Sequence, residues 1–141
     1  MRCVRLMWVG LALLAGPTLG AQAEPYCRPA PFDAEQPPGL PGRYELLGRQ
    51  RAGGPAYSGE LEIRAGSDRF LLTRTVRGQL VRGQARVEHC SPDRFQILRV
   101  RYAQPAPLEL ICYLRFDGDN YMLANCRSVE GSALEAWAQR H

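Results

Sequence analysis

The chain has 141 residues and a formal net charge of +4, and all 18 of its basic residues are arginines. A chain of this length holds one domain with one hydrophobic core. The charge excess is too small, and too little clustered, for a dedicated nucleic-acid-binding protein, so no nucleic acid is expected as a partner. We explain the lack of lysine by a bias toward GC-rich codons in a bacterial genome.

The first 23 residues have the features of a secretory signal peptide. Arg2 and Arg5 precede an apolar run, Leu6 to Leu14, that is too short to span a bilayer, and an Ala-x-Ala motif ends at Ala23. We therefore expect cleavage after Ala23 and export to the periplasm or the exterior of a bacterial cell. Loss of the two arginines would lower the formal net charge from +4 to +2, and no membrane span is expected in the mature chain.

The cysteine content agrees with export. Four cysteines follow the expected cleavage site, and an even number in an oxidising compartment predicts two disulfides. A zinc site would need closely spaced Cys-x-x-Cys or Cys/His pairs, whereas the spacings between the four cysteines are 63, 22 and 14 residues. Disulfides are therefore favoured over a metal site, and no cofactor is expected. The four cysteines are Cys27, Cys90, Cys112 and Cys126.

The expected organisation has three parts: a signal peptide (1–23), a proline-rich extended arm (24–42) and a single β domain (43–141). The arm holds six prolines and shows no sustained periodicity. In the third part, short runs rich in Val, Ile, Leu, Thr, Tyr and Phe alternate with Gly, Pro, Asp and Asn clusters, the pattern of an antiparallel all-β domain. Seven strands are predicted, near residues 43–50, 57–64, 69–77, 80–88, 94–102, 108–116 and 121–128.

Seven consecutive antiparallel strands would leave two sheet edges exposed. We therefore expect an up-and-down barrel, or a strongly coiled sheet, of about seven to eight strands. After the last strand, the Ser132-x-x-Glu135 pattern matches a capping box. The segment SALEAWAQRH is thus predicted to form a short C-terminal helix that docks through Leu134 and Trp137.

The opening of the first predicted strand resembles a known family. The segment PGRYELLG is similar to the Gly-x-Trp start of lipocalin-like (calycin) barrels, with Tyr44 where the tryptophan would sit. The succession GRYEL…YSGELEI…FLLTRTVRGQ is similar to small exported bacterial domains of that shape. This resemblance implies an up-and-down barrel with a central cavity suited to small-molecule binding, and it implies no particular ligand.

The segment TVRGQLVRGQARV repeats Val-Arg-Gly-Gln and carries three arginines. A two-residue turn at Gly78-Gln79 is predicted between its strands, because glycine supplies the positive φ of a primed turn. In the resulting register the three arginines share the outer face: Arg77, Arg82 and Arg86. We interpret them as a solvated face that also discourages edge pairing, with a polyanion-binding strip as the alternative.

Arg74, just before the repeat, is predicted to point toward the core. The expected hairpins place it between Gly59 and Gly83, which would leave room for a long side chain to lie across the sheet. An inward arginine needs an acceptor, because unpaired buried charge is very costly. Either Arg74 anchors an anionic head group inside the barrel, or it pairs internally, with Glu45 for example, or extends to the rim.

The segment ICYLRFDGDNYMLANCR is predicted to form a hairpin with a three-residue loop, 118–120. This register places Cys112 opposite Cys126 and leaves Cys27 and Cys90 to attach the arm to the barrel. Pairings that join the arm to the last hairpin instead stay open at this point. The acidic residues of the loop do not match the spacing of a calcium-binding loop.

No catalytic constellation is predicted, and an enzyme is not expected. The mature chain holds only two histidines, His89 and the terminal His141. Ser91 and Asp93 lie too close to His89 in sequence to meet it around one substrate. The neighbouring Cys90 is expected to be oxidised and is therefore not a nucleophile.

The sequence thus predicts an exported, non-catalytic binding protein of the bacterial envelope that holds a small anionic or amphiphilic ligand in a barrel cavity. The predicted ligand-binding residues are Arg74, Gly59, Gly83, Tyr57 and Tyr44. The alternative is a protein-binding module, such as an inhibitor, an immunity factor or an accessory subunit, that acts through an exposed sheet face rich in tyrosine and arginine. Its tyrosines would be Tyr102, Tyr113 and Tyr121.

Overall fold

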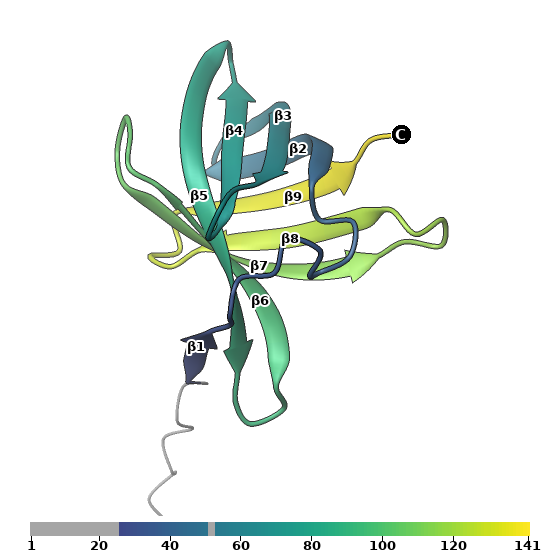
Figure 1. The fold of residues 1–141 in the computed structure, drawn as a ribbon. Helices are drawn as coiled ribbons and strands as arrows, with labels where there is room; N and C mark the ends of the chain where they lie inside the picture. Colours follow the sequence, from purple (N-terminus) through teal and green to yellow (C-terminus); the bar gives the residue numbers. More distant parts are fainter. Residues whose placement is uncertain (1–25, 51–52) are drawn as a thin grey trace, which may run out of the picture.

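The structure is a computed structural model that describes residues 26–50 and 53–141; the expected signal peptide lies outside these ranges. Nine β-strands make up the regular structure of the described residues (Figure 1). They are β1 (Cys27–Pro29), β2 (Gly42–Gln50), β3 (Ala56–Ala65), β4 (Phe70–Val76), β5 (Gln79–Cys90), β6 (Phe95–Tyr102), β7 (Leu108–Phe116), β8 (Met122–Ser128) and β9 (Ala133–Gln139). In the same ranges there is no helix with the length and apolarity needed to cross a bilayer.

Strands β2 to β9 form a closed antiparallel barrel of eight strands. Each strand pairs with the next one in the chain, and β9 closes the barrel by pairing with β2. The short β1 is an extra strand that pairs with the end of β5, beyond the part of β5 that pairs with β4. The predicted all-β, up-and-down barrel is confirmed, and the seven predicted strands agree with β2 to β8 to within two residues at each end.

The predicted C-terminal helix is wrong, because this segment is strand β9. Its side chains alternate: Ala133, Glu135 and Trp137 are buried, whereas Leu134, Ala136 and Ala138 are exposed. As a strand it pairs with both β2 and β8. Closing both open edges of the barrel outweighs the helix propensity of an alanine-rich segment. The Ser132 hydroxyl does not cap a helix and donates to Glu130 instead.

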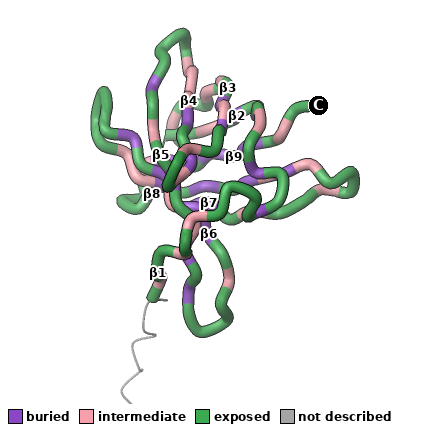
Figure 2. The backbone as a smooth tube through the Cα atoms, in the orientation of Figure 1, coloured by how far each residue is buried: buried purple, intermediate pink, exposed green. Residues whose placement is uncertain are grey.

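The core fills the interior of the barrel with inward side chains from all eight of its strands. Trp137 has the largest side chain among the fully buried residues. Figure 2 shows that buried positions lie along the central parts of the strands, whereas the tips of the hairpins are exposed. This is the period-two pattern on which the strand predictions depended.

The β4–β5 turn differs from the prediction by one residue. Arg77 and Gly78 occupy it, with φ of 51° and 76°. Positive φ at both central residues is the requirement of a type I′ turn, in which asparagine or glycine is more usual than arginine. Arg77 therefore belongs to the turn, whereas Arg82 and Arg86 lie on the exposed face, as predicted.

The new turn shifts the pairing of Arg74 with β5 by two residues, and the β3–β4 connection shifts its pairing with β3 by the same amount. Arg74 lies opposite Leu61 on β3 and Val81 on β5, and not between Gly59 and Gly83. The side-chain period of a strand is two, so a shift of two residues leaves every side chain on its predicted face. Arg74 accordingly points into the barrel, although its predicted neighbours were wrong.

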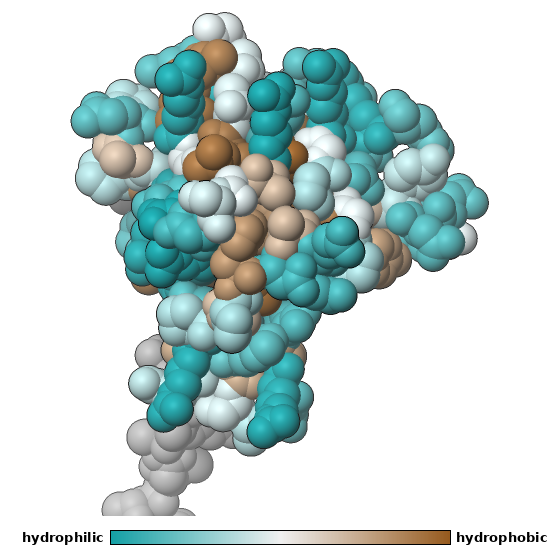
Figure 3. All heavy atoms as spheres, in the orientation of Figure 1, coloured by the Kyte–Doolittle hydropathy of each residue, from teal (hydrophilic) through white to brown (hydrophobic). Residues whose placement is uncertain are grey.

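The proline-rich arm closes the end of the barrel where β2 begins and β9 ends (Figure 1). Leu40 of the arm is fully buried, and the Phe32 ring packs edge-on against Phe70, with 5.3 Å between the ring centroids. The Gln139 side-chain amide donates to the Gly39 carbonyl oxygen at 2.8 Å, which ties the arm to β9. Figure 3 shows hydrophobic side chains gathered in the middle of the face that the arm crosses.

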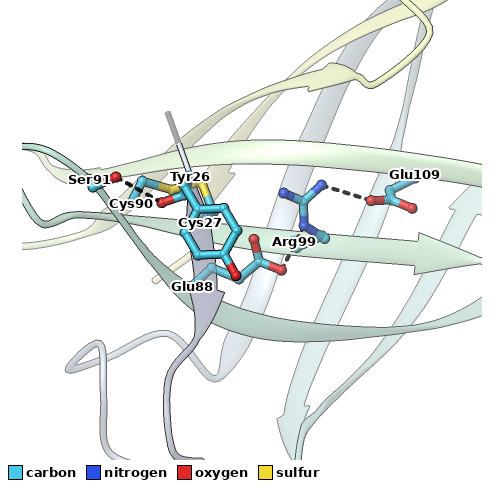
Figure 4. Close-up of a disulfide and its surroundings, with 7 residues drawn as sticks. All are labelled: Tyr26, Cys27, Glu88, Cys90, Ser91, Arg99 and Glu109. Atoms are coloured by element: carbon cyan, nitrogen blue, oxygen red, sulfur yellow. Dashed lines mark hydrogen bonds and ion pairs between the residues drawn. A yellow bond between two sulfur atoms is a disulfide. The ribbon is translucent and has the colours of Figure 1, made fainter. Parts of the chain in front are cut away.

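Two disulfides hold the fold, with the pairing expected from the last hairpin. Cys112–Cys126 joins directly opposed residues of β7 and β8, and both cysteines are buried in the barrel. Cys27–Cys90 joins β1 to the end of β5 and so fastens the arm (Figure 4).

An ion network lies near the arm disulfide on the outer side of the sheet (Figure 4). Arg99 donates to Glu88 at 2.7 Å and to Glu109 at 2.8 Å, and Arg101 also donates to Glu109. Burial alone would raise the pKa of Glu109, but the hydrogen bonds from these two arginines hold it below its usual value. Acidic partners on the same face thus compensate both arginines, and Arg99 and Glu88 form a largely covered pair, with 19% and 10% of their side chains exposed.

Candidate functional site

The end of the barrel opposite the arm opens into a cavity of about 830 Å³, which we call the cup. Its walls come from the β2–β3, β4–β5, β6–β7 and β8–β9 connections, which lie towards the top and left of Figure 1. Tyr57 and Arg74 line the cup from inward-facing strand positions, deeper than the connections. The volume falls within the range of small-molecule sites, roughly 300–1,000 Å³.

Arg74 forms a buried ion pair with Glu135 of β9. Its Nε donates to Oε1 of Glu135 at 3.2 Å, and its Nη2 donates to the same oxygen. The Glu135 side chain is fully buried, whereas 14% of the Arg74 side chain is exposed. Burial alone would lower the pKa of Arg74, but the Glu135 carboxylate outweighs this effect and raises it, so Arg74 remains charged.

The predicted internal partner of Arg74 was wrong. Glu45 lies on the exposed face of β2 and pairs with Arg140 at 3.0 Å. Glu135 was missed because a helix had been predicted for its segment. The signal that could have found it is the alternation of Ala133, Glu135 and Trp137, which puts the carboxylate and the indole on one face of a strand.

Four donated hydrogen bonds satisfy the Glu135 carboxylate. In addition to the two from Arg74, the Tyr57 hydroxyl donates to Oε1 at 2.8 Å and the Trp137 indole N–H donates to Oε2 at 2.9 Å. Burial, together with the neighbouring carboxylate, raises the pKa of Tyr57 to about 12, so its hydroxyl stays protonated and donates. Oε1 thus accepts three of the four hydrogen bonds and Oε2 accepts one, so hydrogen bonds reach both oxygens of the carboxylate.

Gly48 allows Tyr57 to reach Glu135. Gly48 lies on β2, opposite Tyr57 of β3 on one side and Glu135 of β9 on the other. A Cβ atom at Gly48 would lie 2.2 Å from Cζ of the Tyr57 ring. Only glycine therefore lets this ring lie across β2.

Tyr102 borders the Arg74 guanidinium from the other side. The Arg74 Cζ atom lies 5.5 Å from the Tyr57 ring centroid and 5.8 Å from the Tyr102 ring centroid, within cation–π range. Tyr102 points inward and is 3% exposed, contrary to its predicted place on an exposed face. Its buried hydroxyl has no hydrogen-bond partner among the described residues. Burial raises the pKa of Tyr102 well above its usual value, so the hydroxyl is a neutral donor.

The other predicted ligand-binding residues lie outside the cup lining. Tyr44 is buried near the arm, where its hydroxyl donates to the Leu40 carbonyl oxygen. A Cβ atom at Gly59 would lie 2.2 Å from the carbonyl oxygen of Thr75, so this glycine permits close approach of β3 and β4. Gly83 makes room for the Tyr102 ring, whose Cδ1 atom would lie 2.5 Å from a Cβ atom at this position. Of the five predicted residues, the cup brings together Arg74 and Tyr57.

The polar residues considered for other chemistry have local contacts. The His89 Nε2 atom lies 3.0 Å from Nε2 of Gln96. The Asp117 carboxylate accepts the backbone N–H groups of Asp119 and Tyr121, as in a side-chain-stabilised turn. Within residues 26–50 and 53–141, no group of three or more His, Cys, Asp and Glu side chains could hold a metal ion.

Comparison with known proteins supports the fold alone. No protein family matches the chain, and no curated protein sequence matches it. Among solved structures, the chain is similar to a redesigned beta barrel, at 18% sequence identity and a TM-score of 0.53. The match covers 72% of this chain and 91% of the other. It agrees with the closed barrel, whereas the lipocalin-like relationship remains an expectation from the sequence.

Proposed function

We propose that the protein is an exported, non-catalytic binding protein that holds a small anionic or amphiphilic ligand in the cup. The observation that carries this proposal is the position of Arg74, a charged side chain at the base of an open cavity of about 830 Å³. Two disulfides are compatible with an oxidising location such as the periplasm or the cell exterior.

The lining of the cup supports a ligand with two chemically different ends. Apolar side chains contribute to the walls, among them Val76, Val81 and Leu108. The charged group of Arg74 lies deeper, where it can meet a polar head group. A few polar groups in a mainly apolar cavity fix the orientation of a ligand while the walls supply contact area.

A binding role is favoured over catalysis because the polar groups of the site satisfy one another. Tyr57 and Arg74 both donate to Oε1 of Glu135, and the Trp137 indole N–H donates to Oε2, so this carboxylate holds the side chains of the site itself. The described residues that line the cup include no histidine or cysteine. Nucleophilic catalysis commonly uses a nucleophile, a base and a third group that orients the base. The Ser132 hydroxyl in the lining donates to Glu130 at 2.6 Å, and no histidine or cysteine of the described lining residues accompanies them.

The test compares two tryptophan variants of β5 that differ by one position. Val81 lines the cup, so Val81→Trp should fill it, whereas Leu80→Trp adds the same side chain on the exposed face. With 8-anilinonaphthalene-1-sulfonate as the probe, we expect fluorescence enhancement with the wild-type protein and Leu80→Trp, and at least about tenfold weaker binding to Val81→Trp. Equal binding by both variants, or no binding by the wild type, would refute the proposal.

A protein-binding module is the second candidate, supported by apolar side chains on the outside of the barrel. Leu47 of β2 is 64% exposed and Leu134 of β9 is 55% exposed, and Ala136, which is also exposed, lies opposite Leu47. Such a face favours contact with another protein. Native mass spectrometry of protein purified from its own host separates the candidates: a retained small molecule supports the cup, and a co-purified protein lost on Leu134→Glu substitution supports this face.

A further inference from the structure

The open end of the cup, which we call its mouth, carries an arginine whose charge is not compensated. Arg77 lines the cup from the β4–β5 turn, and this hairpin reaches the top of Figure 1. Its exposed side chain makes no ion pair and no hydrogen bond with the described residues. Arg74 differs, because the Glu135 carboxylate compensates its charge at the base of the cup. The positive charge of Arg77 is therefore available to a ligand.

The opposite side of the mouth carries a negative charge. Glu130, in the β8–β9 connection, is the one acidic side chain among the described residues that line the cup. Its carboxylate accepts a hydrogen bond from the Ser132 hydroxyl at 2.6 Å, which holds the pKa of Glu130 below its usual value. Glu130 is thus ionised and does not pair with Arg77. An anionic group at the mouth would be repelled by Glu130 and attracted by Arg77, so the two charges give the mouth a direction.

The backbone of Arg77 is unfavourable for an arginine. Its φ of 51° lies in the left-handed region, and Gly78 follows at 76°. Residues with a side chain rarely adopt this conformation, and asparagine or glycine is preferred at the first central position of a type I′ turn. Unfavourable backbone geometry concentrates at functional positions, where the side chain justifies its cost. An arginine at this position thus favours a use for its charge over the stability of the turn.

We propose that Arg77 selects ligands that carry a negative charge and holds the anionic group at the mouth of the cup. This inference rests on the proposed function of the cup. The ligand class is an amphiphile whose apolar body contacts Val76, Val81 and Leu108 and whose anionic group lies beside the guanidinium. A guanidinium forms charge-assisted hydrogen bonds to carboxylate, sulfonate and phosphate oxygens alike, so Arg77 selects the charge and not one kind of anion.

The experiment uses two fluorescent probes that differ in one sulfonate group, 8-anilinonaphthalene-1-sulfonate and the neutral N-phenyl-1-naphthylamine. We expect Arg77→Asn to weaken binding of the sulfonate about three- to tenfold and to change the affinity for the neutral probe less than about twofold. Arg77→Lys keeps the positive charge and should retain the sulfonate affinity within about threefold. The matched control is Arg82→Asn, which removes an exposed, unpaired arginine outside the cup lining and should change neither affinity.

Thermal unfolding of the same variants gives a second readout. Arg77→Asn places a preferred turn residue before Gly78, so its Tm should rise by about 2–5 °C while the sulfonate affinity falls. Arg82→Asn lies within strand β5, where asparagine is disfavoured, and should not raise the Tm. A variant that only damaged the fold would lose stability and affinity together, so opposite changes identify a role in binding.

The outcomes separate this inference from the proposed function. Binding of both probes that Val81→Trp abolishes and Arg77→Asn leaves unchanged would overturn the role of Arg77 and keep the cup as a binding site. Equal weakening of both probes by Arg77→Asn would also overturn it, because Arg77 would then contribute contact area and not charge. An equal effect of Arg82→Asn on the sulfonate would assign the selection to the net charge of the protein. Absence of binding of either probe to the wild type would count against both proposals.

Discussion

Glu135 is a charged residue in the interior of a small barrel, where isolated charges are very unfavourable. Four hydrogen bonds compensate it, from Tyr57, Arg74 and Trp137. Replacement of a buried ion pair by apolar residues is often neutral for stability, whereas removal of one partner leaves a buried charge unpaired. The pair therefore positions Arg74 and Tyr57 at the base of the cup more than it stabilises the fold.

The first prediction concerns the two halves of this pair. Glu135→Gln leaves Arg74 without its counter-charge, and Arg74→Met leaves Glu135 without its own, so each should lower the free energy of unfolding by about 3–5 kcal/mol. The double variant should be clearly more stable than the sum of the two losses implies. Urea unfolding of the four proteins as a double-mutant cycle measures the coupling.

The exposed pair of Glu45 and Arg140 supplies the control for this cycle. Their side chains are 63% and 45% exposed. Glu45→Gln should change the free energy of unfolding by less than about 1 kcal/mol, because exposed ion pairs contribute little. Additive losses in the Arg74 and Glu135 cycle would show that the two side chains do not form a coupled pair.

At the scale of elements, β9 determines whether the sheet closes. Its local sequence contains good helix formers, and its first residues follow a capping pattern. Its pairing partner β2 lies about ninety residues earlier in the chain, so the interaction that selects the strand is not local. Non-local pairing of this kind overrides weak intrinsic propensity.

The second prediction tests β9 with two substitutions of Ala136. This residue lies opposite Leu47 of β2 and Asn125 of β8, with its side chain exposed. Ala136→Pro should lower the free energy of unfolding by about 3 kcal/mol or more, because proline removes a ladder hydrogen bond in a central strand. Ala136→Val should be neutral or slightly stabilising, since valine favours strands. A loss with Ala136→Val, measured by thermal unfolding, would instead fit a helix.

The sequence predicted most of the strands of the barrel and part of the candidate site. Strands β2 to β8 could be predicted because alternation and turn residues are local signals. The inward direction of Arg74 was also predictable, since a register error of two residues does not change the face. Its partner was not, because Glu135 lies 61 residues away and its carboxylate points inward only if β9 is a strand. Tyr102 was predicted to lie on an exposed face, although its alternation with the buried Leu98 and Val100 places it inside the barrel.

At the scale of the whole molecule, the two disulfides hold different parts of the barrel. Cys112–Cys126 closes a short loop within the β7–β8 hairpin, with a sequence separation of 14 residues. Cys27–Cys90 has a separation of 63 residues and links the arm to β5. A cross-link over a longer loop removes more conformational entropy from the unfolded chain.

The third prediction compares the two bridges. The chain-entropy relation gives a loss of about 4 kcal/mol for Cys27→Ala/Cys90→Ala and about 3 kcal/mol for Cys112→Ala/Cys126→Ala. Guanidinium unfolding of both double variants measures these losses. In the first variant, the Ser91 amide should also lose hydrogen-exchange protection, because it donates to Tyr26 next to the bridge. Unchanged stability of the first variant would show that the arm opens independently of the barrel.

Because the arm seals one end of the barrel and leaves the other open, the sequence of the open end can vary without affecting the seal. The contacts that hold the arm, at Leu40 and Gln139, lie at one end, whereas the four connections around the cup lie at the other. Loop exchange or randomisation at the open end would therefore leave the residues that seal the closed end untouched. A library built on these four connections could acquire new recognition properties on a constant scaffold.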